Sequence, residues 1–258
     1  MLTNLTAIVL GAVEGLTEFL PISSTAHLTL TAQIMGLDQS AFVKTFEIAI
    51  QSGAILAVIV LYWRRFLDVA VLKRVLAAFI PTAIIGLILY KLVKEYLIGN
   101  IAVTLWALAI GGLALIVFEK WFKTKPESDM SDIRSLSYGK SVLVGLVQAI
   151  SIIPGVSRSA ATIIGGLFCG LSREAVVEFS FLLAVPTVLA ATGLDLFRSA
   201  GDFHSSDFGL LAIGFIAAFV AAILAIKFLL NYLKKHTFTG FGVYRILVVL
   251  IFVVVLYL

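Results

Sequence analysis

Long apolar runs separated by short polar stretches dominate the chain and predict a bundle of membrane-spanning helices. A helix that crosses a bilayer needs about 20 mostly apolar residues. Six segments meet this requirement, at residues 43–62, 74–93, 101–119, 174–197, 208–231 and 243–258. The composition agrees, because 61% of the 258 residues are hydrophobic and 13% are charged, whereas about 25% are charged in an average soluble protein. We therefore expect an all-α membrane protein with six transmembrane helices.

Two further apolar regions are too short to cross the membrane alone, and each is interrupted by a polar break. Residues 2–13 and 28–37 flank the first break, around Pro21, and residues 142–147 and 163–171 flank the second, around Pro154. Short apolar arms around a Pro or Gly break are typical of re-entrant helical hairpins. Non-helical backbone at membrane depth is tolerated where protein or a water-filled cavity surrounds it.

The two halves of the chain match each other at a constant offset of 134 residues, and the match includes both breaks. Residues 1–120 and 141–258 are each expected to hold one hairpin and three spans, joined by a cytoplasmic linker at 121–140. Three spans invert the second half, so the two hairpins oppose each other. Inverted repeats place a binding site near the midplane, at discontinuous helices. The matched pairs are Gly11 and Gly145, Glu14 and Gln148, Ser23 and Ser157, Gly36 and Gly170, Leu37 and Leu171, and Ala41 and Ala175.

The distribution of basic residues predicts how the chain is oriented, since cytoplasmic loops are enriched in Lys and Arg. The basic loops follow the first, third and fifth spans, which puts both termini and the opening of the first hairpin on the outer side. The net charge of +4 does not indicate nucleic-acid binding, because these residues do not form a continuous stripe. They are Arg64, Arg65, Lys73 and Arg74, then Lys120, Lys123, Lys125, Arg134 and Lys140, then Lys234 and Lys235.

Two carboxylates precede the first break, where ionisable residues are costly and usually functional. Glu14 and Glu18 are four residues apart and therefore share one helix face. Carboxylates in an apolar setting repel each other, so this pair would share a proton or hold a divalent cation such as Mg²⁺ or Ca²⁺.

Hydroxyl groups and a histidine follow the acids. Ser23, Ser24 and Thr25 are positioned either to cap the next helix or to contact a phosphate. His27 lies within one turn of Ser24, where a neutral imidazole can deprotonate a serine or water, or attack phosphorus itself.

The second break carries groups that favour an anion. Gly155 permits a turn that lets backbone approach a ligand, and the helix that follows offers its free N–H groups. Arg158 supplies a planar fork that matches phosphate oxygens, and Ser157, Ser159 and Thr162 add hydroxyl donors.

Three other polar residues within the predicted spans are weaker candidates. Gln51, Glu178 and Asp195 are each explained equally well by hydrogen bonds between neighbouring helices.

The stretches Glu14-Gly-Leu-Thr-Glu18-Phe-Leu-Pro21-Ile-Ser23-Ser24-Thr25-Ala-His27 and Pro154-Gly155-Val-Ser157-Arg158-Ser159-Ala-Ala-Thr162 together resemble the two signatures of the bacterial undecaprenyl-diphosphate phosphatases, the UppP/BacA family. The resemblance extends over essentially the whole chain. It implies an enzyme of the bacterial inner membrane that removes the terminal phosphate of undecaprenyl diphosphate. The product is the lipid carrier of peptidoglycan synthesis. Bacitracin resistance and dependence on a divalent metal are further properties of the family.

The resemblance also assigns roles to residues. The family's acidic pair falls on Glu14 and Glu18, its serine and histidine on Ser24 and His27, and its phosphate-binding motif on Ser157, Arg158 and Thr162. Either Ser24 or His27 would be the nucleophile, unless water attacks directly. Alanine stands at 26 and 160, where the family often has glycine, and we expect slightly stiffer loops with activity retained.

The lipid tail is expected to leave between spans, along apolar faces near Phe179–Leu183. A homodimer is left open. The alternative function is a polyprenyl-phosphate flippase or anion transporter, because inverted repeats with broken helices are also a transporter architecture. Such a protein would need Arg158 but has no evident use for Glu14, Glu18 and His27 together.

Overall fold

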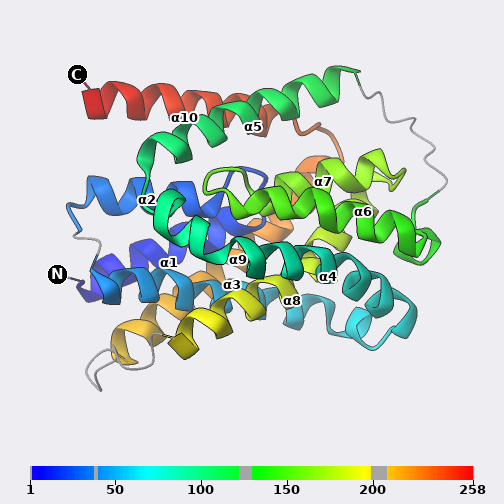
Figure 1. Ribbon diagram of the computed structural model, residues 1–258, viewed down its shortest axis with the longest axis horizontal. Coiled ribbons are helices and arrows are strands. Elements are labelled where there is room, and N and C mark those ends of the chain that lie inside the picture. Colours follow the sequence, from blue (N-terminus) through cyan, green and yellow to red (C-terminus); the bar gives the residue numbers. More distant parts are fainter. Residues whose placement is uncertain (1, 38–39, 122–129, 199–207, 258) are drawn as a thin grey trace.

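A computed structural model describes residues 2–37, 40–121, 130–198 and 208–257 of the chain. These residues are helical throughout, apart from turns and one isolated bridge between Met130 and Leu171 (Figure 1). The helices are α1 (Asn4–Glu18), α2 (Ser24–Ile34), α3 (Ala41–Phe66), α4 (Val69–Leu92), α5 (Ile101–Trp121), α6 (Tyr138–Ala149), α7 (Arg158–Phe168), α8 (Arg173–Arg198), α9 (Phe208–Leu233) and α10 (Thr239–Tyr257). Three short elements join them: η1 (Val93–Leu97), η2 (Ile133–Ser135) and η3 (Ile150–Ile152).

Five of the described helices are long and apolar enough to cross a membrane, namely α3, α4, α5, α8 and α9. They confirm the first five predicted spans. The sixth predicted span, 243–258, corresponds to α10, which is apolar but shorter than these five. The chain is therefore an all-α, multi-pass membrane protein.

Two helix ends differ from the prediction for clear physical reasons. The predicted first span stops at 62, where Tyr62 has non-helical angles (φ −118°, ψ 20°) and kinks α3; helical turns then continue to Phe66 and include Arg64 and Arg65 in the last turn, where cations are favourable. The predicted second span starts at 74, but α4 starts at Val69, because the Asp68 carboxylate caps the free N–H groups of Ala70 and Val71.

The two polar breaks have the same backbone conformation at matched positions. Ser23 and Ser157 have φ angles of 73° and 74°, and no other described non-glycine residue has a positive φ. Each serine is the N-cap of the helix that follows, and its hydroxyl oxygen accepts from the N–H of the alanine three residues on, Ala26 or Ala160. A left-handed serine costs free energy, so its occurrence twice at an offset of 134 residues supports the sequence match.

Helices of one half pack against helices of the other (Figure 1). The pairs are α1 with α9, α4 with α6, α3 with α8, and α5 with α10. The first two pairs use glycine for close approach. An added Cβ would lie 2.3 Å from the Gly214 carbonyl oxygen at Gly11, and 1.9 Å from the Ala78 carbonyl oxygen at Gly145. The matched glycines thus make equivalent contacts in the two halves.

The described residues of the basic loops lie toward one end of the bundle, and both chain ends lie at the other (Figure 1). Three contacts join these loops. Arg134 of the linker pairs with Asp68 after α3, at 2.7 Å from Nε to Oδ2, and holds the pKa of that carboxyl below its usual range. Arg173, the first residue of α8, pairs with Glu119 at the end of α5, which also accepts from the Phe238 N–H before α10, at 3.0 Å.

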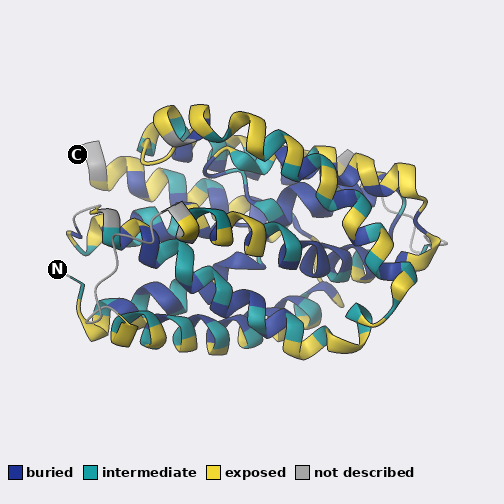
Figure 2. Cartoon of the chain, turned by 60° about the horizontal axis from the view of Figure 1, so that its bottom comes forward, coloured by how far each residue is buried: buried dark blue, intermediate teal, exposed yellow. Residues whose placement is uncertain are grey.

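The outer surface of the bundle is largely apolar, and buried residues face inward between the helices (Figure 2). Large apolar side chains such as Leu87, Trp106 and Ile251 are exposed on the outer faces, as expected for a protein that lies in lipid. Phe179, Phe181 and Leu183 are fully buried. The predicted tail path along Phe179–Leu183 is therefore wrong, because neighbouring helices already cover these side chains.

Candidate active site

The two breaks meet at the Glu18 carboxylate, although they are about 140 residues apart in sequence. Oε2 of Glu18 accepts from the Ser24 hydroxyl at 2.5 Å, and Oε1 accepts from Arg158 Nη2 at 2.9 Å. All three side chains are largely removed from solvent, with Glu18 8% and Arg158 11% exposed. A charge-assisted pair in such a position holds the groups in fixed geometry.

Arg158 is oriented by residues on both sides of the site. Its Nη1 donates to the carbonyl oxygen of Ser180 at 2.8 Å, and its guanidinium lies 5.8 Å from the centre of the Phe19 ring. The Thr162 hydroxyl lies 2.5 Å from that of Ser180, and the Ser159 hydroxyl donates to the Phe19 carbonyl at 2.8 Å. The two predicted hydroxyls therefore support Arg158 and the first break.

Two charged groups of opposite sign have buried polar atoms without a partner. Among the described residues, both carboxylate oxygens of Glu14 and the Nε of Arg158 are buried and lack a hydrogen bond. The charges that act on Glu14 include those of Glu18, Glu47 and Arg158. An unpaired buried group is costly, so Arg158 needs an acceptor at Nε, and the Glu14 carboxylate beside Glu18 needs either a proton shared between the two or a cation.

His27 is held away from the carboxylate. Its Nδ1 lies 2.8 Å from the Ser23 carbonyl, so this nitrogen carries a hydrogen, and its Nε2 lies 2.9 Å from the Tyr244 hydroxyl. The two rings stack, with centres 5.6 Å apart. In the neutral ring Nε2 is therefore the acceptor. No hydrogen bond joins His27 to Glu18, Ser24 or Arg158 among the described contacts.

The remaining predicted site residues either cap or shape the backbone of the two breaks or lie at the exposed edge of the site. Ser23 and Ser157 are helix caps, and Thr25 is exposed. Gly155 has a φ of 96°, and an added Cβ would lie 2.3 Å from the Thr104 carbonyl oxygen, so glycine is needed there. The alanines at 26 and 160 are buried in the first turns of α2 and α7, where alanine suits the helix.

A family model described as bacitracin resistance protein BacA matches residues 7–251 of the chain. The chain belongs to the BacA family. Similar proteins include the undecaprenyl-diphosphatase of Aquifex aeolicus, 50% identical over 97% of this chain and 98% of the relative. That of Sulfurihydrogenibium sp. is 47% identical over 95% and 96%, and that of Thermus thermophilus is 44% identical over 93% and 92%. Both signature stretches lie inside the matched region.

Three residues of this BacA family member were missed at the sequence level. Ser180 and Tyr244 contact Arg158 and His27 through atoms that only the fold brings together. Arg245 was detectable, because it is a lone arginine within an apolar run, and such residues are functional candidates. Of the weaker candidates, Glu178 pairs with Arg65 of α3, and Asp195 accepts from Tyr90 of α4 at 3.4 Å, which fits the predicted interhelical role.

The acidic pair fits one kind of metal site only. Within the described residues, no three or more His, Cys, Asp or Glu side chains are grouped to hold a metal ion. A hard cation such as Mg²⁺ is often bound by one or two carboxylates, with water and substrate phosphate completing the shell. The unpartnered Glu14 carboxylate beside Glu18 matches that donor set.

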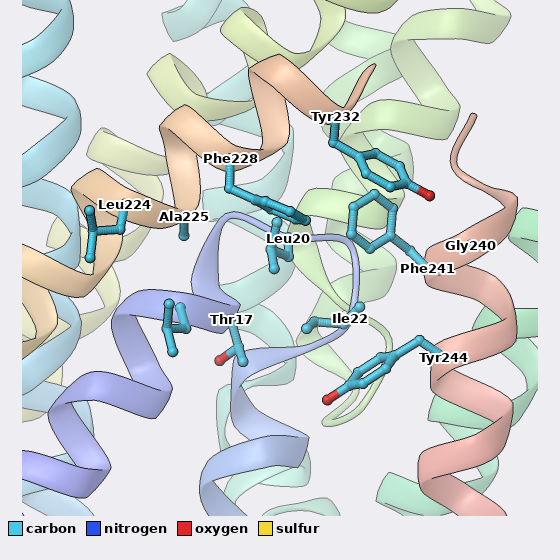
Figure 3. Close-up of a pocket in the computed structure, with 11 residues that line it drawn as sticks. Thr17, Leu20, Ile22, Leu224, Ala225, Phe228, Tyr232, Gly240, Phe241 and Tyr244 are labelled. Atoms are coloured by element: carbon cyan, nitrogen blue, oxygen red, sulfur yellow. The ribbon is translucent and has the colours of Figure 1, made fainter. Parts of the chain in front are cut away.

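An apolar groove of about 630 Å³ borders the first break. Figure 3 shows Leu20 and Ile22 of the break, Phe228 and Tyr232 of α9, and Tyr244 of α10 around it. Tyr244 links the groove to the site, since its hydroxyl also bonds His27. The other lining residues are Leu16, Thr17, Leu224, Ala225, Gly240 and Phe241.

Proposed function

We propose that the chain hydrolyses undecaprenyl diphosphate to undecaprenyl phosphate and phosphate, and so regenerates the lipid carrier of cell-wall synthesis. The observation that carries this proposal is the Glu18 carboxylate, which is shared by a serine from one break and an arginine from the other. The relatives are all named undecaprenyl-diphosphatase, over more than nine-tenths of the chain. The flippase or transporter alternative is not favoured, because it explains neither the Ser24–Glu18 contact nor these names.

Arg158 and the start of α7 bind the terminal phosphate. The Arg158 Nε–H lacks a partner and points to a missing acceptor, and a phosphate oxygen supplies one. The N–H groups of the first turn add partial positive charge. The guanidinium remains held by Ser180, so it stabilises charge on the transferred group without reorganising.

Ser24 is the nucleophile that the geometry favours. As its oxygen attacks the terminal phosphorus, Glu18 accepts the hydroxyl proton across the existing 2.5 Å contact. The new bond is Ser24 Oγ–P, and the bond that breaks joins phosphorus to the bridging oxygen, which leaves as undecaprenyl phosphate. Water then attacks the phosphoserine, phosphate leaves, and the proton returns from Glu18 to Ser24.

His27 serves the second step. Its Nε2 is the acceptor nitrogen of the neutral ring and lies one turn beyond Ser24. It takes the proton of the attacking water once the Tyr244 hydroxyl has moved aside. The Nδ1–H contact to Ser23 fixes this tautomer.

Glu14 and Glu18 would hold a divalent cation, Mg²⁺ or Ca²⁺, when substrate is bound. When bound, the ion would neutralise charge on the phosphate oxygens. The support for this assignment is the unpartnered Glu14 carboxylate. Without an ion, Glu14 would repel both Glu18 and the substrate.

The groove beside Tyr244 takes the first isoprene units of the lipid. It is lined by apolar and aromatic side chains, which suits a hydrocarbon chain. The groove lies between the first break, α9 and α10 (Figure 3), and two of its lining residues, Leu224 and Phe228, are exposed at the surface of the bundle. The membrane lipid and the substrate tail thus meet at this side.

In the membrane, α10 is the sixth span, and α1–α2 and α6–α7 are opposed re-entrant hairpins. The repeats are 1–120 and 141–258, joined by the linker 121–140. Support comes from the left-handed serines at a 134-residue offset and from the pairing of equivalent helices. The membrane is the bacterial inner membrane, and the basic end of the bundle faces the cytoplasm, so that the site opens to the outer side.

Phosphate release from undecaprenyl diphosphate by the purified protein tests this function. We expect turnover that stops in chelator and returns with Mg²⁺ or Ca²⁺. A Ser24→Ala variant should lose the acid-stable phosphoserine that forms in rapid-quench experiments. No release by the wild type would contradict the function, and full activity in chelator would contradict the metal assignment alone.

Sealed vesicles test the orientation. Substrate confined to the leaflet that faces the chain termini should be hydrolysed, and substrate in the opposite leaflet should not. Cysteine accessibility at the ends of α1 tests the hairpin, because a re-entrant arm does not place its ends on opposite sides. Hydrolysis only from the basic-loop side would reverse the assignment.

A further inference from the structure

A single buried arginine lies between the two breaks and outside the proposed chemistry. Arg245 of α10 has no exposed surface, and no carboxylate pairs with it within the described residues. A buried, unpaired charge is among the most expensive features that a protein can keep. Its retention therefore requires a compensating set of contacts.

All five N–H donors of Arg245 bind backbone carbonyl oxygens. Nε donates to Leu108 at 3.1 Å, and Nη2 donates to Ala107 at 3.2 Å and Gly155 at 2.9 Å. Nη1 donates to Pro21 at 3.3 Å and Val156 at 3.1 Å. Because the donor set of a guanidinium is then complete, Arg245 has none left for substrate.

These contacts join equivalent points of the two halves. Pro21 precedes Ser23 by two residues in the first break, and Gly155 precedes Ser157 by two in the second, so the two carbonyls match at the 134-residue offset. One guanidinium therefore fixes both breaks immediately before their left-handed serines. Helix α5 makes room for it at Gly111, where an added Cβ would lie 2.2 Å from Nη2.

We propose that Arg245 is a positioning residue that holds the two breaks in register, and thereby sets the contact between Glu18 and Arg158. Its role follows from geometry rather than from contact with the reacting atoms. The measurement of kcat rests on the proposed hydrolysis, whereas a measurement of the distance between the breaks does not. Lysine in its place keeps the charge yet offers at most three donors, which leaves at least two of the five carbonyls unpaired.

Arg245→Lys and Gly111→Ala test this role in complementary ways, since the first removes donors and the second displaces the guanidinium. We expect kcat to fall by about 100-fold in Arg245→Lys, as for a misplacement of roughly 1 Å, with KM within about threefold of wild type. Gly111→Ala should lower kcat in the same direction. The matched controls are Arg173→Lys, a paired arginine away from the breaks, and Gly193→Ala, a helical glycine with open space around it. Neither should change kcat.

Pulsed EPR distances provide a readout that is independent of turnover. Spin labels at Thr25 and Ile153, both exposed, in a Cys169→Ala background should give one narrow distance distribution, which broadens in Arg245→Lys and in Gly111→Ala. If Arg245→Lys does not fold, Gly111→Ala decides the question. A wild-type kcat or an unchanged distribution in the folded variants would overturn the proposal. An inactive wild type with the expected distances would contradict only the hydrolysis.

Discussion

The two breaks share a backbone but differ in the groups they carry. Ser23 and Ser157 adopt the same left-handed conformation and cap the next helix in the same way. At matched places, the first break has Ser24 where the second has Arg158. The same backbone conformation is thus used twice to begin a helix inside the bundle. In the proposed mechanism the side chains divide the chemistry, with proton transfer in the first break and phosphate binding in the second.

The matched pair Glu14 and Gln148 shows the same division. Both are fully buried. The Gln148 amide nitrogen donates to Thr82 at 2.8 Å and to Thr187 at 3.2 Å, while its Oε1 has no partner; the Glu14 carboxylate has only the Glu18 carboxylate with which to share a hydrogen bond. The residue that matches Thr187 in the first half is Gly53, which has no side chain to offer. The Gln148 amide nitrogen is satisfied by hydroxyls of neighbouring helices, whereas the Glu14 carboxylate needs a proton shared with Glu18 or a cation.

The largest effect is expected at Arg158, the group that distinguishes the second break. Arg158→Lys keeps the charge but loses the planar fork and the Nε–H that has no partner. Loss of a charge-assisted contact in a water-poor site costs on the order of 2–5 kcal/mol, or about 30- to several-thousand-fold in rate. Steady-state kinetics measure this. Near wild-type turnover would show that Arg158 supplies only general positive charge.

Glu14→Gln tests whether the first break needs its charge. We expect a loss of about 100-fold in kcat and no stimulation by divalent metal. Thermal stability should be equal or higher, because an unpaired buried carboxylate is removed. Gln148→Ala is the control, since it should lower stability without abolishing the metal response. A Glu14→Gln enzyme that still responds fully to metal would assign the ion elsewhere.

In the proposed mechanism the groove beside the first break holds the lipid tail, so filling it should change KM more than kcat. Leu224→Trp enlarges an exposed side chain of the lining and so fills part of the groove. Displacing about two methylene groups of the lipid costs about 1.6 kcal/mol, which corresponds to roughly tenfold in KM. We expect this rise for long-chain substrates, with kcat and the KM of a short, soluble diphosphate unchanged. An equal effect on short and long substrates would place the tail elsewhere.

Much of this arrangement could be read from the sequence, because apolar runs, the 134-residue offset and the two polar stretches are local features. The expected opposed hairpins predicted that Glu14, Glu18 and His27 would lie near Ser157 and Arg158. The contact of Glu18 with Arg158 agrees with this, whereas the His27 ring bonds Ser23 and Tyr244 instead. What the sequence could not supply were contacts set by helix packing, such as Tyr244 on His27 and Ser180 on Arg158. The tail path was wrong for the same reason, since the apolar character of Phe179–Leu183 does not reveal which neighbours cover these residues.

The smallest effect separates two hydroxyls at matched positions, Thr25 and Ser159. The buried Ser159 hydroxyl donates to the Phe19 carbonyl and so ties α7 to the first break, whereas Thr25 is exposed. Ser159→Ala leaves that buried carbonyl without its donor and should cost about 1 kcal/mol of stability, or roughly 2–4 °C in Tm for a chain of this size. Thr25→Ala should stay within about 0.5 kcal/mol of wild type. Thermal unfolding in the same detergent compares the two. Equal shifts in Tm would mean that the two matched hydroxyls contribute equally to stability, and that the two breaks differ less than their contacts indicate.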